Sequence, residues 1–135
     1  MMEFILESKE KHIFTCILLH GMYQNSESLK DLGNYLQKNN NNLKLILVNA
    51  PIMNINWPSG IEYNVSSWYN YYTEYNGLIK FDIINSYQFK QQTNRIEKLI
   101  KNEIKSNCIN ARNIILLGES QGGTVAINAG LKSNY

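Results

Sequence analysis

Ten consecutive residues decide how this chain folds: Ile114-Ile115-Leu116-Leu117-Gly118-Glu119-Ser120-Gln121-Gly122-Gly123. A short apolar run leads into a Gly-x-Ser-x-Gly pattern, and an apolar helical segment of small residues follows at 124–131. This order of strand, sharp turn and helix is typical of a nucleophile elbow. The turn is so tight that the residues flanking Ser120 must be small, which explains Gly118 and Gly122. Ser120 is then held above the sheet at a helix N-terminus, where the helix dipole favours developing negative charge.

A glycine-rich turn between a strand and a helix has a second interpretation, as a site that binds phosphate or another oxyanion. The pattern here lacks the lysine of a phosphate-binding loop and does not match Gly-x-Gly-x-x-Gly. The sequence therefore favours a serine nucleophile at this turn over a nucleotide-binding module.

The rest of the chain supplies the strands and helices that an elbow needs around it. Three nearly continuous apolar runs predict parallel strands buried on both faces, at residues 13–19, 43–48 and 114–117. A weaker strand at 4–6 is expected to pair with the first of these. Apolar residues at helical spacing predict helices at 26–38 and 93–105, and a third helix follows Ser120. This alternation predicts an α/β fold with a mostly parallel sheet.

An aromatic stretch at 51–85 stands apart from these elements. It holds Trp57, Trp68 and many tyrosines, and it is too long for an ordinary connection. Its aromatic side chains could line an apolar pocket, or they could pack against the sheet. The sequence leaves both interpretations open.

The composition of the 135 residues limits the classes of protein to consider. Hydrophobic residues make up 44% and charged residues 18%, which is typical of one globular domain. The net charge of +2 gives no basic surface for nucleic acid. No apolar run approaches the roughly 18 residues of a membrane span, and the acidic N-terminus does not resemble a signal peptide. We therefore expect a soluble cytoplasmic protein.

Four motifs together carry a resemblance to a known family: Leu18-Leu19-His20-Gly21, Asn49-Ala50-Pro51, Ser67-Trp68-Tyr69 and the elbow itself. With these motifs the chain resembles the phospholipase/carboxylesterase family of α/β-hydrolases, which includes the acyl-protein thioesterases. The resemblance runs from about residue 13 to residue 131. It implies a three-layer α/β sandwich around a mostly parallel sheet. One departure is Asn70, which stands where the family usually has an acidic residue.

The resemblance also implies an activity. Ser120 would be the nucleophile, and the backbone N–H groups of Met22 and Gln121 would form the oxyanion hole. The substrate would be an acyl ester or thioester, such as a lipid-modified protein or a lysophospholipid, and no cofactor or metal would be needed. Trp57 and Trp68 are candidates for lining the acyl pocket.

Two members of the catalytic triad are missing from this pattern. In the α/β-hydrolase fold the triad runs Ser, Asp, His along the chain, and no Asp or His follows Ser120. His12 and His20 are not expected to replace the base. The chain is therefore interpreted as a single, incomplete domain over 1–135, truncated after the elbow helix. The alternative is a catalytically inactive form that binds lipid or protein. Truncation would also leave strand 114–117 at a sheet edge, where it would provide a site for self-association.

Overall fold

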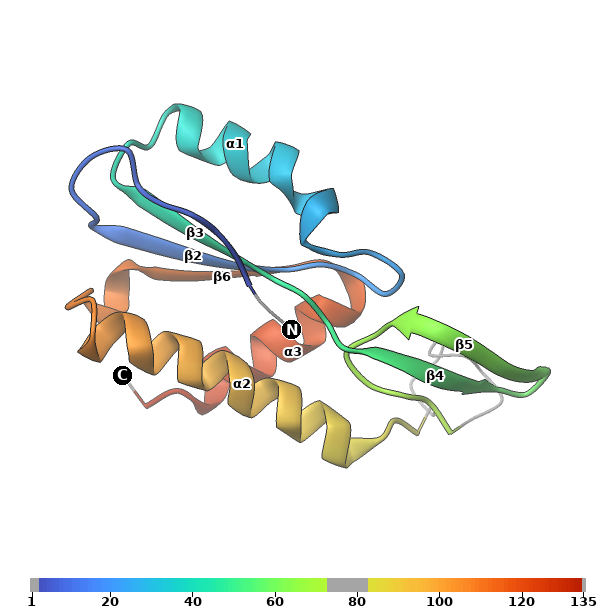
Figure 1. The fold of residues 1–135 in the computed structure, drawn as a ribbon. Coiled ribbons are helices and arrows are strands. Elements are labelled where there is room, and N and C mark those ends of the chain that lie inside the picture. The colour runs from blue at the N-terminus through green and yellow to red at the C-terminus, as the bar shows by residue number, and fades with distance from the viewer. Residues whose placement is uncertain (1–2, 73–82, 135) are drawn as a thin grey trace.

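The computed structural model describes residues 3–72 and 83–134, arranged around a central sheet (Figure 1). This sheet has four strands in the order β1-β3-β2-β6. Strand β1 spans Phe4–Leu6, β2 Phe14–Leu19, β3 Leu43–Val48 and β6 Ile114–Gly118. Strands β3 and β6 run parallel to β2 on either side of it, whereas β1 is antiparallel to β3. The mostly parallel sheet predicted from the sequence is confirmed.

Helices cover both faces of the sheet, as Figure 1 shows. On one face lies α1 (Lys30–Lys38), which is preceded by the 3-10 turn η1 (Ser26–Leu29). On the other face lie α2 (Ser86–Lys105) and α3 (Ser120–Lys132). A second 3-10 turn, η2 (Ala111–Asn113), leads into β6. The result is the predicted three-layer arrangement.

Hydrophobic side chains fill the space between each pair of layers. The larger cluster joins β2 and β3 to the two helices below them and includes Ile17, Val48, Trp68, Ile96 and Val125. The smaller cluster joins the opposite sheet face to the η1–α1 segment and includes Cys16, Leu18, Leu29, Leu45 and Leu47. Cys16 belongs to this second core because burial there suits a small apolar side chain.

Strand β1 does not pair as expected. It was predicted to lie beside strand 13–19, and that prediction is wrong, because Phe4 is opposite Leu47 of β3. The physical reason is that both edges of β2 are already occupied, by β3 and by β6. Strand β1 pairs instead with the outer edge of β3, which β2 leaves open.

Strand β6 is not buried on both faces, contrary to the prediction made for strand 114–117. Within the described residues it lies at the edge of the sheet. Its face toward α3 is covered, but Ile115 is 48% exposed and Leu117 is 42% exposed. An open strand edge flanked by apolar side chains is therefore present at this position.

The aromatic stretch contains a hairpin that the sequence did not reveal. Strands β4 (Ile52–Trp57) and β5 (Gly60–Ser66) pair antiparallel and form a separate two-stranded sheet, seen beside the main one in Figure 1. The return is tight, and Gly60 has a φ of +135°, which only glycine adopts readily. Residues 73–82 of the aromatic stretch lie outside the described residues.

Helix α2 is longer than predicted. It begins at Ser86, ahead of the expected start at residue 93. The Asn85 side chain accepts a hydrogen bond from the Gln88 amide and caps the N-terminus. The extra turns place Gln88 against the aromatic stretch, where its side chain accepts from the Asn70 amide over 2.7 Å.

Candidate active site

Ser120 occupies a strained turn between β6 and α3. It is the first residue of α3, it is exposed, and its φ is +50°. A left-handed backbone is disfavoured for a residue with a Cβ and persists only where the surroundings enforce it. Here the amide of Glu119 donates to the carbonyl of Leu19 over 3.0 Å, which ties the turn to β2. The serine hydroxyl is thus presented at the carboxyl end of the parallel strands.

The glycines that flank Ser120 are required by close backbone contacts. A Cβ on Gly118 would lie 2.6 Å from the Cα of Gly123. A Cβ on Gly122 would lie 2.3 Å from the carbonyl oxygen of His20. Both distances are far below any real Cβ contact, so neither position accepts a side chain without backbone movement. The elbow helix and the end of β2 therefore meet backbone to backbone.

The loop after β2 lies beside the serine. A Cβ on Gly21 would lie 3.5 Å from the Cβ of Ser120. The Gly21 amide donates to Oε1 of Gln24, and the Tyr23 amide donates to the carbonyl of Ser66. Within residues 21–24 of the described chain, only the Met22 amide lacks a protein acceptor. It is therefore free to donate to a bound oxyanion.

Gln121 contributes more than a backbone amide to this region. Its amide lies in the first turn of α3, where N–H groups have no acceptor within the helix. Its buried side chain donates from Nε2 to Tyr69 O and Ser67 Oγ, and its Oε1 accepts from the Trp68 amide over 2.9 Å. Both polar atoms of this side chain bond to one segment, residues 67–69. The side chain thereby fastens the aromatic stretch to the elbow helix.

His20 is held as a neutral structural residue. It is completely buried, and the Ala50 amide donates to its Nε2 over 3.0 Å. Its Nδ1 therefore carries the proton and donates to the carbonyl of Gly21 over 2.7 Å. Burial lowers the pKa of the imidazole below its ordinary value. With both nitrogens engaged, His20 shapes the loop and has no nitrogen left for the Ser120 hydroxyl.

His12 lies at the other end of β2. Its Nε2 is 2.7 Å from Oγ1 of Thr15, whose hydroxyl donates to the buried carboxylate of Glu103. This places the imidazole near residue 14, where β2 begins, and not near residue 19, where the loop to the serine starts. Neither histidine is thus placed as a base for the elbow.

A comparison of the whole sequence with protein families agrees with the elbow geometry of a left-handed serine between two close glycine contacts. A family model described as Phospholipase/Carboxylesterase matches residues 1–135. The chain belongs to the phospholipase/carboxylesterase family. The resemblance drawn from the four motifs is thereby confirmed.

Individual relatives extend well beyond the matched region. Acyl-protein thioesterase 1 homolog 2 of Dictyostelium discoideum is 30% identical over 132 residues, which is 96% of this chain and 56% of that protein. The structure of Zea mays acyl-protein thioesterase 2 matches with a TM-score of 0.73 at 20% identity, over 93% of this chain and 48% of the maize chain. A Bacillus cereus carboxylesterase matches with a TM-score of 0.65 at 17% identity, over 98% and 53%. The chain thus spans about half the length of these family members, and the structural likenesses establish the α/β-hydrolase fold.

The two tryptophans proposed for the acyl pocket lie in different surroundings. Trp68 is 0% exposed, with its indole ring 5.3 Å from the His20 ring, so it presents no surface to a ligand. Trp57 is half-buried on the hairpin, where it stacks on Tyr71 and donates from Nε1 to Glu62. Of the two interpretations of the aromatic stretch, Trp68 fits packing against the sheet. A role for Trp57 beside the acyl chain stays a prediction.

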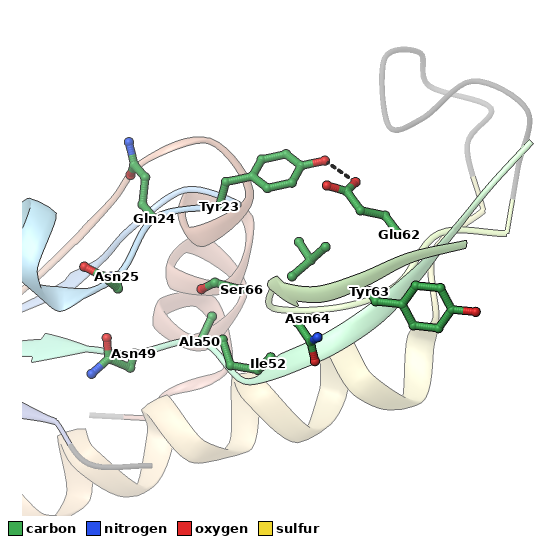
Figure 2. A pocket seen from close by; sticks show the side chains of 11 residues that line it. Tyr23, Gln24, Asn25, Asn49, Ala50, Ile52, Glu62, Tyr63, Asn64 and Ser66 are labelled. Atoms are coloured by element: carbon green, nitrogen blue, oxygen red, sulfur yellow. Dashed lines mark hydrogen bonds between the residues drawn. The ribbon is translucent and has the colours of Figure 1, made fainter. Parts of the chain in front are cut away.

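A pocket of about 400 Å³ opens between the loop after β2 and the hairpin (Figure 2). Its lining combines apolar surface with polar side chains, among them Tyr23, Gln24, Asn49, Glu62 and Ser66. The hydroxyl of Ser66 is buried there without a hydrogen-bond partner in the described structure. This pocket could not be predicted from the sequence, because the hairpin that forms one wall was not predicted.

Asn70 departs from the family pattern but keeps the function of an acceptor. Its Oδ1 accepts from the amides of Asn56 and Tyr71, over 3.0 and 2.8 Å. A carboxylate at this position would accept the same two hydrogen bonds. The amide oxygen therefore takes the place of the usual acidic side chain and joins β4 to residues 70–71.

Among residues 3–72 and 83–134, no three His, Cys, Asp or Glu side chains gather in a way that could hold a metal ion. None of the helices in the same residues has the length and apolar character of a membrane span.

Proposed function

We propose that this chain carries the nucleophile and the oxyanion hole of a hydrolase for carboxylic esters or thioesters. The observation that carries the proposal is the left-handed Ser120, exposed at the head of α3 and beside Gly21. Membership of the phospholipase/carboxylesterase family supports the same reaction class. The printed names of the relatives, acyl-protein thioesterase and carboxylesterase, favour a substrate with an acyl group on sulfur or oxygen. Lipid-modified proteins and lysophospholipids are the proposed sources.

The reaction would proceed through an acyl-enzyme. The Ser120 hydroxyl gives up its proton to solvent water as its oxygen bonds to the carbonyl carbon, and the carbonyl oxygen becomes an oxyanion that accepts hydrogen bonds from the Met22 and Gln121 amides. When the tetrahedral intermediate collapses, the bond to the alcohol or thiol breaks and the leaving group takes a proton. Water then cleaves the acyl-serine, which releases the carboxylic acid and restores the hydroxyl. Each oxyanion donor contributes about 2.7–4 kcal/mol in enzymes of this type.

The described residues place no histidine as a general base for Ser120. The imidazole of His20 is doubly hydrogen-bonded and His12 lies at the far end of β2. Without a base a serine hydroxyl is a poor nucleophile, and triad-deficient serine hydrolases retain only about 10³–10⁴-fold catalysis over water. We therefore expect slow chemistry at Ser120 in this chain by itself.

Labelling with a fluorophosphonate probe tests whether Ser120 is the reactive serine. We expect slow labelling of the purified chain, abolished in Ser120→Ala and unchanged in Ser59→Ala. Ser59 is a matched control because it is also exposed, on the hairpin turn. Labelling that survives Ser120→Ala would reject the assignment, and so would an absence of labelling in folded protein.

A second candidate function, as a catalytically silent binding module, is favoured by the open edge of β6. Its exposed Ile115 and Leu117 line an apolar groove of about 300 Å³ together with Phe14, Cys16, Leu36, Leu43 and Asn40. None of the described residues that line this groove is charged, so two copies could pair edge to edge without repulsion. Sedimentation analysis tests this candidate. Leu117→Lys should dissociate a dimer, and Ile61→Lys, an exposed apolar site on the hairpin, should not.

A further inference from the structure

Tyr23, the residue after Met22, has a backbone conformation that its side chain disfavours. Its φ is +69°, in the left-handed region where aromatic residues are uncommon. Such a conformation persists where contacts elsewhere hold it. The structure provides these contacts at both the backbone and the side chain of Tyr23.

Both contacts come from strand β5. The Tyr23 amide donates to the carbonyl of Ser66 over 2.9 Å. The Tyr23 hydroxyl donates to Oε2 of Glu62 over 2.8 Å, the interaction drawn as a dashed line in Figure 2. Hydrogen bonds to a carboxylate are about twice as strong as those between neutral groups. The loop after β2 is therefore attached to the hairpin at two points of one residue.

Glu62 is itself held in place by the hairpin. Its Oε2 also accepts a hydrogen bond from Nε1 of Trp57, over 2.7 Å. The Trp57 ring stacks on Tyr71, with centroids 5.6 Å apart and planes 21° from parallel. The carboxylate thus joins β4, β5 and the loop after β2, and its position does not depend on Tyr23 alone.

The Met22 peptide lies between two fixed residues. On one side Gly21 donates to Gln24 and accepts from Nδ1 of His20. On the other side Tyr23 is held by Ser66 and Glu62. We infer that the Tyr23–Glu62 contact fixes the direction of the Met22 amide, and that these two side chains are positioning residues of the oxyanion hole. The inference rests on the proposed function of that amide.

Backbone dynamics measured by ¹⁵N relaxation test the inference in the chain as it stands. In Tyr23→Phe and in Glu62→Gln, we expect the order parameter of the Met22 amide to fall from about 0.85 to below about 0.6. Hydrogen exchange of the Tyr23 amide should become about tenfold faster. The Met22 order parameter should fall no further in the double variant than in either single variant, because the two side chains act as one contact. Amides of β2 and β3 should keep their protection.

Tyr63→Phe is the matched control, because Tyr63 is an exposed tyrosine next to Glu62 on the same strand. It should leave Met22 and Tyr23 unchanged. An ordinary Met22 order parameter in folded Tyr23→Phe and Glu62→Gln protein would overturn the inference. A loss of order in Tyr63→Phe equal to that in Tyr23→Phe would overturn it as well.

Fluorophosphonate labelling separates this inference from the proposed function. If Ser120 labels, Tyr23→Phe should slow the labelling about tenfold while Tyr63→Phe does not. If Met22 loosens in the variants but Ser120 never labels, the positioning contact stands and the proposed function fails. If Ser120 labels equally well in all of these variants and Met22 stays ordered, the positioning role fails alone.

Discussion

The indole Nε1–H of Trp68 donates a hydrogen bond of 2.7 Å to the backbone carbonyl of His20, 48 residues earlier in the chain. A Cβ on Gly122 would press on the same carbonyl oxygen. The end of β2, the aromatic stretch and the elbow helix therefore meet at one backbone group. The contacts around it place the loop after β2 beside Ser120.

Replacing Trp68 should weaken the fold more than replacing Trp57. Trp68→Phe removes the hydrogen bond to His20 and leaves a cavity in the core, so we expect a loss of about 2–3 kcal/mol in the free energy of unfolding. Trp57→Phe, on the half-buried hairpin, should lose about 1 kcal/mol. Urea denaturation measures both, and equal losses would contradict the structural role given to Trp68.

Two glycines of α3 should respond in opposite directions to alanine. Gly122→Ala forces a Cβ to within 2.3 Å of the His20 carbonyl, and we expect a loss of at least about 3 kcal/mol or failure to fold. At Gly130 the nearest atom to a Cβ is the Leu116 side chain, at 3.4 Å. Gly130→Ala should therefore raise the free energy of unfolding by up to about 1 kcal/mol, because alanine has the higher helix propensity. Thermal unfolding of the two variants gives the comparison, and a tolerated Gly122→Ala would contradict the tight elbow.

Acid should weaken the fold through the buried carboxylate of Glu103. Burial by itself would raise the pKa of this carboxyl, but hydrogen bonds from Lys44 and Thr15 outweigh it and hold the pKa below its ordinary value of 4.5. The unfolded chain therefore binds a proton at higher pH than the folded chain does. The stabilisation is complete above the ordinary pKa and is lost as pH falls through the lower, folded value.

Glu103→Gln tests this contribution. It leaves the Lys44 ammonium buried without its countercharge, so we expect a loss of about 3–5 kcal/mol at neutral pH and a shallower loss of stability in acid. Glu27→Gln is the control, because that carboxylate pairs with Lys30 on the surface. Its replacement should change the free energy of unfolding by less than about 1 kcal/mol. If the free energy of unfolding falls equally steeply with decreasing pH in Glu103→Gln and in the unmodified chain, Glu103 is not the cause of the acid sensitivity.

Asn70 should tolerate a carboxylate and reject an apolar side chain. Asn70→Asp keeps an acceptor for the Asn56 and Tyr71 amides, so we expect the free energy of unfolding to change by no more than about 1 kcal/mol. Asn70→Leu leaves the Asn56 and Tyr71 amides without this acceptor and should lower the free energy of unfolding by about 2–4 kcal/mol. Chemical denaturation distinguishes the two, and equal losses would mean that the acceptor is not what matters at this position.

The parts of the fold that the sequence predicted are those that local pattern determines. Strands β2 and β3 are almost continuously apolar because most of their side chains are buried on both faces, and Ser120 with its glycines is a contiguous motif. The hairpin was missed because most of its side chains are exposed and only Ile55 and Val65 are buried. Its alternation of polar and apolar residues is correspondingly weak.

The supporting contacts of the site could not be predicted in the same way. The Gln121 side chain reaches the Trp68 amide 53 residues away, and Tyr23 reaches Glu62 across 39 residues. Such pairs depend on how the aromatic stretch folds back over the elbow, and no local spacing encodes that. The prediction for β1 was wrong for a similar reason. The partner of β1 depends on the fact that β6 occupies one edge of β2, and β6 lies about 100 residues later in the chain.

Chemical rescue tests the central claim most directly, namely that Ser120 is a nucleophile in a prepared oxyanion site that needs a base. Hydrolysis of a short acyl thioester would be followed as imidazole is added, with Ser120→Ala measured in parallel to subtract the reaction of imidazole itself. The account predicts that the rate above this background rises with imidazole concentration for the unmodified chain. Equal rates for the two proteins at every imidazole concentration would contradict it.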